Sequence, residues 1–259
     1  MSFKIVKEGD ASPKLSSRQQ NRIATEARFE REWLTNPEQF NPTRNVKEQE
    51  RIQRTLNAIH ITPCKGCDLG FGYGTLSDAL IDKGFEIDAI DVASNALKHY
   101  QGKAKTSQDY APYTKLEDNA YALVLATDLI AYLPETEHRL LISELARLIK
   151  LDGTLVISSP IDIDSEDAAS RFLSLIHTEF NIEEIIPSHH ALWIRLWRWH
   201  FLRPLINNKR ALSLFESISR YFSHDNALSH LIVTAKRRPL YVPPTPPIEE
   251  RKQKRTVWE

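Results

Sequence analysis

Residues 67–74, Cys-Asp-Leu-Gly-Phe-Gly-Tyr-Gly, carry the clearest chemical signal in this chain of 259 residues. Glycine occupies every second position, as Gly70, Gly72 and Gly74. This alternation does not suit a stable strand or helix, because glycine loses the most backbone entropy on folding and has no side chain to pack. It suits a sharp turn whose backbone touches a ligand. Asp68 stands directly before the turn, so the segment predicts a ligand site with a carboxylate beside it.

Two acids around the turn indicate which ligand it would bind. In nicotinamide dinucleotide sites the third glycine comes three residues after the second, and the turn meets a pyrophosphate. Here the third glycine comes after two residues, and Asp68 would repel a pyrophosphate but attract an ammonium group. Asp91, at the end of the next apolar run, can accept charge-assisted hydrogen bonds from both hydroxyls of a ribose. The pattern predicts a site for a cationic nucleoside. A dinucleotide site, and Asp91 as a helix N-cap, are the alternatives.

Alternating strands and helices would position these groups. Short apolar runs predict strands at 66–69, 85–90, 121–127, 154–158, 182–186 and 229–235. Helical periodicity predicts helices at 75–83, 94–100, 135–149 and 165–178. The alternation predicts an α/β fold with a mostly parallel sheet covered by helices on both faces.

Four segments resemble the motifs of class I S-adenosylmethionine-dependent methyltransferases. Two of them are Asp-Leu-Gly-Phe-Gly-Tyr-Gly from residue 68 and Gly-Phe-Glu-Ile-Asp-Ala-Ile-Asp-Val from residue 84, and the others span 116–134 and 145–159. The resemblance covers about residues 60–160 and the last strand. It implies a doubly wound, Rossmann-like fold with a seven-stranded, mostly parallel sheet, and an enzyme whose cofactor is S-adenosylmethionine.

The resemblance also implies which residues hold the cofactor. The glycine turn would surround its methionine part, while Asp91 would bind the ribose and Val92 would flank the adenine. Asp109 falls where the family has an acid near the adenine amine, and Thr127 falls where the family faces the sulfonium. The implied cofactor-binding residues are Asp68, Gly70, Phe71, Gly72, Gly74, Asp91, Val92, Asp109, Tyr110, Thr127 and Asp128.

The chain departs from the family pattern at two places. Tyr121-Ala122 replaces the family's frequent aromatic-Asp pair, and Ala131-Tyr132 replaces its Glu-His, so a histidine base is missing there. A nitrogen acceptor can do without a base, whereas a hydroxyl acceptor benefits from one. The candidate bases are His189, His190 and Tyr132, and solvated or structural histidines are the alternative reading of the pair.

Cys64 and Cys67 form a Cys-x-x-Cys sequence. This spacing has two functional interpretations, a redox-active dithiol and half of a zinc site. A structural zinc site normally needs a second pair of ligands at matching spacing, and none follows. We expect structural thiols and no metal site.

The texture of the sequence divides the chain into three parts. Residues 1–57 are polar and helical in pattern, which predicts an N-terminal arm or lid. The resemblance implies that residues 58–238 form the methyltransferase domain, in which we expect 187–222 to be a helical insertion that caps the acceptor side before the last strand. Residues 239–259 begin with several prolines and continue as a charged run, which predicts an extended tail.

Residues 191–203 contain three tryptophans and three arginines. Such a segment can pack as a lid on the sheet or on a second subunit of a homodimer, or it can contact a membrane surface or a lipid-linked acceptor. A membrane role predicts vesicle binding that is lost on substitution of Trp193 and Trp197. We do not expect nucleic acid as the main partner, because the aromatic residues are not spread as a stacking platform and the 34 basic residues balance 34 acidic ones.

The bulk composition is ordinary, with 41% apolar and 26% charged residues. No run approaches the length of a membrane span, and the first residues lack an apolar signal core, so we expect a cytoplasmic protein with a peripheral membrane contact at 191–203. The sequence predicts methyl transfer to oxygen or nitrogen of a small-molecule or glycan- or lipid-linked acceptor. An inactive methyltransferase-fold binding or scaffold protein, and an RNA or protein methyltransferase, are the alternatives.

Overall fold

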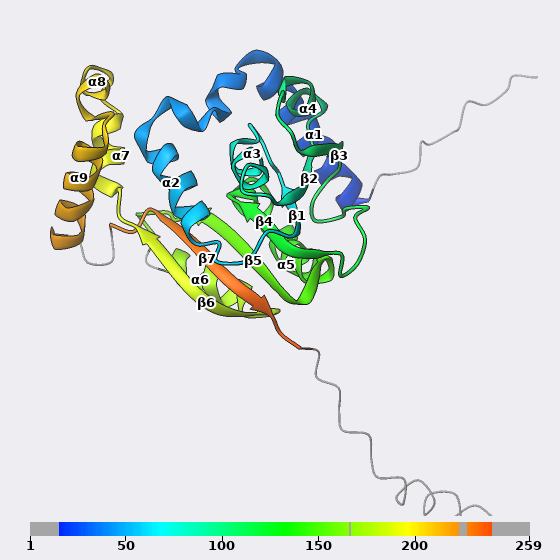
Figure 1. Ribbon diagram of the computed structural model, residues 1–259. Coiled ribbons are helices and arrows are strands. Elements are labelled where there is room, and N and C mark those ends of the chain that lie inside the picture. Colours follow the sequence, from blue (N-terminus) through cyan, green and yellow to red (C-terminus); the bar gives the residue numbers. More distant parts are fainter. Residues whose placement is uncertain (1–15, 166, 223–226, 240–259) are drawn as a thin grey trace, which may run out of the picture.

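The computed structural model describes residues 16–165, 167–222 and 227–239. A seven-stranded sheet lies at its centre, with helices on both faces (Figure 1). The predicted doubly wound, mostly parallel sheet is confirmed. The predicted tail lies outside the described residues except for its first position, and so do the first fifteen residues of the arm.

The strands lie in the order β3-β2-β1-β4-β5-β7-β6, and only β7 runs against the others. Their bounds are β1 Lys65–Leu69, β2 Glu86–Asp91, β3 Lys105–Gln108, β4 Tyr121–Thr127, β5 Ile149–Pro160, β6 Phe180–Ser188 and β7 His230–Arg237. Strand β3 was not predicted, because it is a short edge strand with a polar sequence. The chain proceeds from β1 through β2 to β3 at one edge and then crosses to β4 on the other side of β1, so the strand order reverses between β1 and β4. Ligands of such sheets bind at the carboxyl ends of the strands at this point.

Two apolar clusters fill the two faces of the sheet. One joins β1, β4 and β5 to helices α5 and α6, and the other joins β2, β4, β5 and β7 to α3 and to α2, which spans Val46–Asn57. The bounds of the helices that follow β1 within the sheet region are α3 Thr75–Ile81, α4 Ser94–His99, η3 Leu129–Tyr132, α5 Glu135–Leu148 and α6 Ala168–Ile176. Cys67 belongs to the first cluster, and burial raises the pKa of its thiol well above its usual value, in keeping with a structural role.

The N-terminal arm is helical and arches over the carboxyl ends of the strands (Figure 1). It comprises α1 Ser17–Thr35, η1 Pro37–Phe40, η2 Pro42–Arg44 and α2 Val46–Asn57. Asn36-Pro37 and Asn41-Pro42 interrupt the helices, because a proline disfavours helical geometry in the residue before it.

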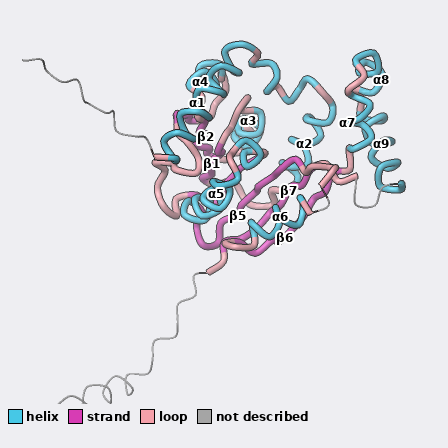
Figure 2. Tube along the Cα trace, turned by 180° about the vertical axis from the view of Figure 1, so that it is seen from behind, coloured by secondary structure: helices cyan, strands magenta, loops and turns pink. Residues whose placement is uncertain are grey.

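The insertion between β6 and β7 stands at one side of the molecule, next to α2, in both views (Figures 1 and 2). It comprises α7 Ala191–Trp197, η4 His200–Leu202, α8 Arg203–Ile206 and α9 Lys209–Phe222. None of the helices in the described residues is both long enough and apolar enough to span a membrane.

Candidate cofactor and acceptor site

The glycine turn connects β1 to α3 in a conformation that needs glycine. Gly70, Gly72 and Gly74 have φ angles of 71°, 56° and 79°, in the left-handed region that side chains disfavour. A Cβ atom on Gly74 would lie 2.3 Å from Cε2 of Tyr100. The amides of Gly70 and Phe71 both donate to the carbonyl of Ile90, at 2.8 and 3.1 Å, so the turn is fixed to the end of β2.

Asp68 is buried below this turn at the end of β1. Its Oδ2 accepts a hydrogen bond of 2.7 Å from the Ser77 hydroxyl, while its Oδ1 is buried without a partner among the described residues. Burial raises the pKa of Asp68 to about 6, because a charged carboxylate loses its hydration there. An ammonium group placed beside Oδ1 would satisfy the free oxygen.

Asp91 is the last residue of β2 and holds the turn from the other side. Its Oδ2 accepts from the Gly72 amide at 3.2 Å, and its Oδ1 accepts from the Ala93 amide at 2.9 Å. Burial raises the pKa of Asp91 to about 6. The alternative reading, a helix N-cap, is wrong. The N-cap of α4 is Ala93, and the amides at the start of that helix donate to Glu30 of α1 at 2.5 and 3.1 Å.

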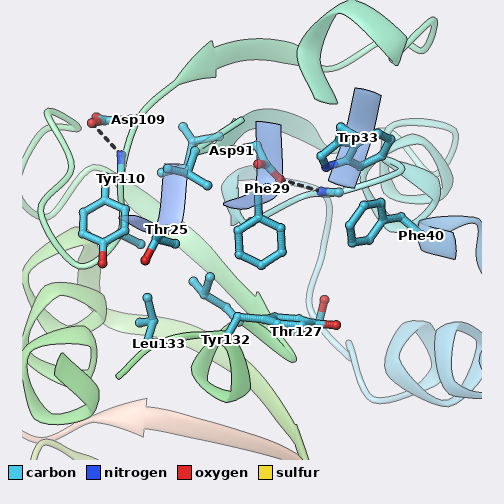
Figure 3. A pocket seen from close by; sticks show the side chains of 16 residues that line it. Thr25, Phe29, Trp33, Phe40, Asp91, Asp109, Tyr110, Thr127, Tyr132 and Leu133 are labelled. Carbon is cyan, nitrogen blue, oxygen red and sulfur yellow. Dashed lines mark hydrogen bonds between the residues drawn. The ribbon is translucent and has the colours of Figure 1, made fainter. Parts of the chain in front are cut away.

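A small apolar cavity of about 90 Å³ lies over Asp91, between the sheet and the N-terminal arm (Figure 3). The sheet region contributes Gly70, Gly72, Asp91, Val92, Asp109, Tyr110, Thr127 and Tyr132, all predicted site residues. The arm contributes Thr25, Phe29, Trp33 and Phe40, which the sequence did not indicate. Phe29 meets Tyr132 edge-on with 5.4 Å between ring centroids, so the arm closes the cavity over the glycine turn.

Asp109 and Tyr110 form the outer wall of the small cavity. Both oxygens of Asp109 are engaged, accepting from the Tyr110 amide at 2.9 Å and the Lys115 amide at 2.6 Å. The Tyr110 hydroxyl donates to Glu137 at 2.5 Å, and Asn21 of α1 donates to the same carboxylate at 3.1 Å. The Asp109 carboxylate thus shapes the loop, and Tyr110 ties that wall to the arm.

A second, larger cavity of about 730 Å³ adjoins the small one. Five residues line both, namely Phe40, Gly70, Gly72, Thr127 and Tyr132. The predicted site residues Asp68, Phe71, Gly74 and Asp128 line the large cavity only. Every residue predicted to bind the cofactor therefore lines one cavity or the other.

Comparisons with known proteins agree with this geometry. Residues 67–153 match the family described as "Methyltransferase domain". The N-methyltransferase NodS from Bradyrhizobium japonicum, solved with S-adenosylhomocysteine, superposes with a TM-score of 0.58 and 15% identity, over 83% of this chain and 99% of that one. Residues 67–153 are a methyltransferase domain, with the fold of a methyltransferase solved with S-adenosylhomocysteine.

Other solved structures share the fold at low identity. The [4+2]-cyclase SpnF has a TM-score of 0.53 and 15% identity over 74% of this chain and 81% of that one. A TehB-like methyltransferase from Corynebacterium glutamicum has a TM-score of 0.51 and 13% identity over 72% and 87%. No curated protein matches the sequence significantly. Likeness at this identity shows the fold of the methyltransferase domain, and the acceptor has to be inferred from the large cavity.

The polar floor of the large cavity is a cluster that the sequence did not predict. Asp128 follows β4 with a left-handed φ of 61°. Its Oδ1 accepts 2.8 Å from the Ser158 hydroxyl and lies 2.6 Å from Nε2 of His230, while its Oδ2 lies 3.3 Å from Nη1 of Arg51. Burial raises the pKa of Asp128, but the charges of Arg51 and His230 outweigh burial and hold that pKa well below its usual range. Arg51 also donates to Glu48 at 2.8 Å.

Two buried polar atoms on residues that line the large cavity, Asp68 Oδ1 and His230 Nδ1, lack a hydrogen-bond partner among the described residues. A third, Arg51 Nη1, makes no hydrogen bond there but lies 3.3 Å from Asp128 Oδ2 in an ion pair. Buried polar atoms are rarely left unpaired, because each loses its hydration without compensation. Their concentration here indicates a site that is completed by polar groups of a ligand.

The structure does not bring His189 and His190 to either cavity. They follow β6, and β7 and β5 separate that edge strand from β4. His189 Nδ1 accepts from Arg220 at 3.3 Å, and burial lowers its pKa. Of the three candidate bases, only Tyr132 lines the cavities.

His190 belongs to an ion-pair network at the base of the insertion. Ligand atoms of Glu50, His190 and Glu216 lie within 4.8 Å of one another, a spacing that could suit a metal ion. Arg54 of α2 already donates to both carboxylates, reaching Glu216 at 2.7 Å. The guanidinium supplies the positive charge at this place.

Proposed function

We propose that the protein transfers a methyl group from S-adenosylmethionine to oxygen or nitrogen of an acceptor bound in the large cavity. The observation that carries this proposal is the junction of the two cavities at Thr127 and Tyr132. Adenosine in the small cavity, with its ribose on Asp91, and the ammonium group on Asp68 leave the sulfonium at that junction. Its methyl group then points toward the larger volume.

The floor of the large cavity supports an acceptor with a polar nucleophile. The acceptor's lone pair forms the new bond to the methyl carbon as the bond from sulfur to that carbon breaks, and its electrons return to sulfur. For a hydroxyl acceptor, we assign the neutral form of His230 to receive the proton at Nδ1, because Asp128 holds its other ring nitrogen, Nε2, at 2.6 Å and a neutral imidazole can act as a general base. Arg51 lies beside them and would hold an oxygen of the acceptor.

The experiment that tests the proposal combines binding and transfer. S-Adenosylhomocysteine should bind at micromolar concentration in calorimetry, and absence of binding would refute an enzyme of this kind. The protein is then incubated with methyl-labelled donor and an extract of the cells that produce it. Label in the organic phase indicates a lipid-linked acceptor and label in the small polar fraction a small or glycan acceptor. Label only in RNA or protein, or binding without transfer, contradicts the proposed acceptor class.

Binding of S-adenosylhomocysteine is expected to weaken as the pH falls below about 6. The ligand's ammonium and ribose groups favour the ionised forms of Asp68 and Asp91, whose pKa values burial raises to about 6 in the free protein. Between about pH 7.5 and pH 5, each carboxylate should weaken binding by about tenfold at most. Calorimetry at both pH values measures this effect, and a pH-independent affinity would contradict it.

The raised pKa values of Asp68 and Asp91 make the ligand-free protein less stable as the pH rises, whereas they make ligand binding stronger. A carboxyl whose pKa is raised by folding contributes stability that is full below its unfolded value near 3.8 and is lost as the pH rises through about 6. The rise in melting temperature on adding S-adenosylhomocysteine should therefore be larger at about pH 7.5 than at about pH 5. Asp68→Asn should flatten this dependence.

A further inference from the structure

One buried tryptophan packs the insertion against α2 of the N-terminal arm. Trp193 is 1% exposed, stacks on Trp197 with 4.4 Å between centroids, and donates from Nε1 to the Ile206 carbonyl at 3.2 Å. It packs with Ile206, Leu212 and Val46 of α2. Trp193 is therefore part of the core of the insertion, and the predicted vesicle test on Trp193 and Trp197 would disrupt this packing instead of testing a surface.

The outer end of the insertion exposes large apolar side chains. Helix α7 ends at Trp197, and the chain continues through η4 into α8, so Trp199 and Phe201 do not share the buried face of Trp193. Trp199 is 59% exposed, Phe201 69% and Leu205 70%. The rings of Trp199 and Phe201 lie 5.7 Å apart. We call these three residues the apolar tip; contiguous exposed groups of this kind mark interaction sites.

Basic residues flank the apolar tip in the sequence. The sequence contains no Asp or Glu between Glu184 and Glu216, and its cations in that interval are Arg195, Arg198, Arg203, Lys209 and Arg210. Arg195 and Arg198 are exposed and have no carboxylate partner among the described residues. The tip therefore combines aromatic surface with unpaired positive charge, which complements an anionic surface.

We propose that the apolar tip docks on the surface of an anionic lipid bilayer. Trp199, Phe201 and Leu205 would enter the interfacial layer, and the flanking cations would face anionic headgroups. Aromatic residues that combine an apolar ring with a polar edge favour this layer. This docking is independent of methyl transfer.

If the proposed function holds, docking of the apolar tip would bring the large cavity close to the bilayer. Trp197 and Arg203 line that cavity, and Arg203 donates to the Trp197 carbonyl at 2.9 Å while its guanidinium lies 5.4 Å from the Trp197 ring. The cavity is thus bounded by the segment that carries the tip. A lipid-linked acceptor would reach the methyl donor from the bilayer with its polar end first.

The test is co-sedimentation of the full chain with vesicles of phosphatidylcholine alone and of phosphatidylcholine with about 30% phosphatidylserine. Wild type should bind the anionic vesicles, and added salt should weaken this binding. The double variant Trp199→Ala, Phe201→Ala should lose at least about tenfold in partitioning, and Arg198→Glu about fivefold or more. The matched control is Leu151→Ala on β5, also 59% exposed and distant in sequence, which should bind as wild type does.

Several outcomes would overturn the proposal. These are no binding of wild type to anionic vesicles, full binding by the double variant, or equal loss in the Leu151 control. A dimer in analytical ultracentrifugation that the double variant dissociates would assign the tip to a second copy of this chain. Salt-dependent retention of RNA without vesicle binding would assign it to nucleic acid. An unchanged melting temperature of the double variant shows that any loss is not caused by unfolding.

Discussion

Asp91→Ala should abolish measurable binding of S-adenosylhomocysteine. Asp91 lines the small cavity at the end of β2. Its carboxylate would accept both ribose hydroxyls, and each charge-assisted bond contributes about 1.5–3 kcal/mol. Loss of both corresponds to an affinity lower by about 10²–10⁴-fold. The substitution also frees the Gly72 amide, which adds mobility of the turn to the loss. Isothermal titration calorimetry measures the change.

A neighbouring acid on the same strand provides the control for Asp91. Asp88 accepts 2.9 Å from the Tyr121 hydroxyl and lies 3.5 Å from Lys65, and it lines neither cavity. Asp88→Ala should therefore leave the dissociation constant within about twofold. If Asp91→Ala binds as tightly as Asp88→Ala does, the ribose is held elsewhere and the proposed orientation of the donor is wrong.

Arg54→Met should lower the free energy of unfolding by about 3 kcal/mol, the lower end of the range for a broken buried ion pair. Arg54 joins α2 to α9 through Glu216, at 2.7 and 3.2 Å, and to β6 through the Pro187 carbonyl at 3.2 Å. Methionine keeps much of the volume but removes the closest cation from the buried Glu216 carboxylate. The carboxylate is then left with the exposed Arg220 at 3.1 Å, His190 Nε2 at 3.7 Å and the His189 amide at 3.4 Å. Urea unfolding measures the change, and hydrogen exchange should locate the loosening in α9.

The pH dependence separates this effect from a general packing defect. Burial raises the pKa of Glu216, but His190 and Arg54 outweigh burial and hold it well below its ordinary value of 4.5. A lowered pKa contributes stability above the unfolded value that is lost as the pH falls through the folded value. The difference between wild type and Arg54→Met should therefore shrink below about pH 4.5. A difference that stays constant down to about pH 3 would contradict the ion-pair explanation.

Arg171 offers a matched control for Arg54. It pairs with Asp167 at 2.5 Å, four residues earlier, and both side chains are 63% exposed. Exposed pairs of this kind contribute about 0–1 kcal/mol, because solvent screens them and side-chain entropy opposes them. Arg171→Met should therefore change stability by less than about 1 kcal/mol. An equal loss in both variants would indicate that removing any arginine, and not the buried network, causes the effect.

The donor side of the site could be predicted from the sequence because its signals are local. The glycine turn places three residues with left-handed backbone angles within five positions of the sequence. Asp91 ends the next strand, so the turn and this acid both lie where neighbouring parallel strands end. The acceptor side could not be predicted, because Arg51, Asp128 and His230 are brought together only by tertiary packing. His230 begins β7, the antiparallel strand between β5 and β6. No motif in the sequence around it indicates a functional residue.

The insertion shows a similar division. Its helical character follows from composition, but the side on which each tryptophan lies depends on where α7 ends. A continuous helix would have placed Phe201 with Trp193 and Trp197. The break after Trp197 instead exposes Phe201 and leaves Trp193 in the core. Tertiary packing decides at which residue a helix ends, and one sequence alone does not reveal those contacts.

The N-terminal arm also has a consequence for the order of events in turnover. While Glu30 holds α1 against α4, the small cavity is covered by Phe29 and Thr25 and communicates with the large one. A nucleoside must then enter before the acceptor fills the large cavity, and it must leave after the methylated product has departed. Steady-state kinetics would then be ordered, with the demethylated nucleoside as the last product to dissociate.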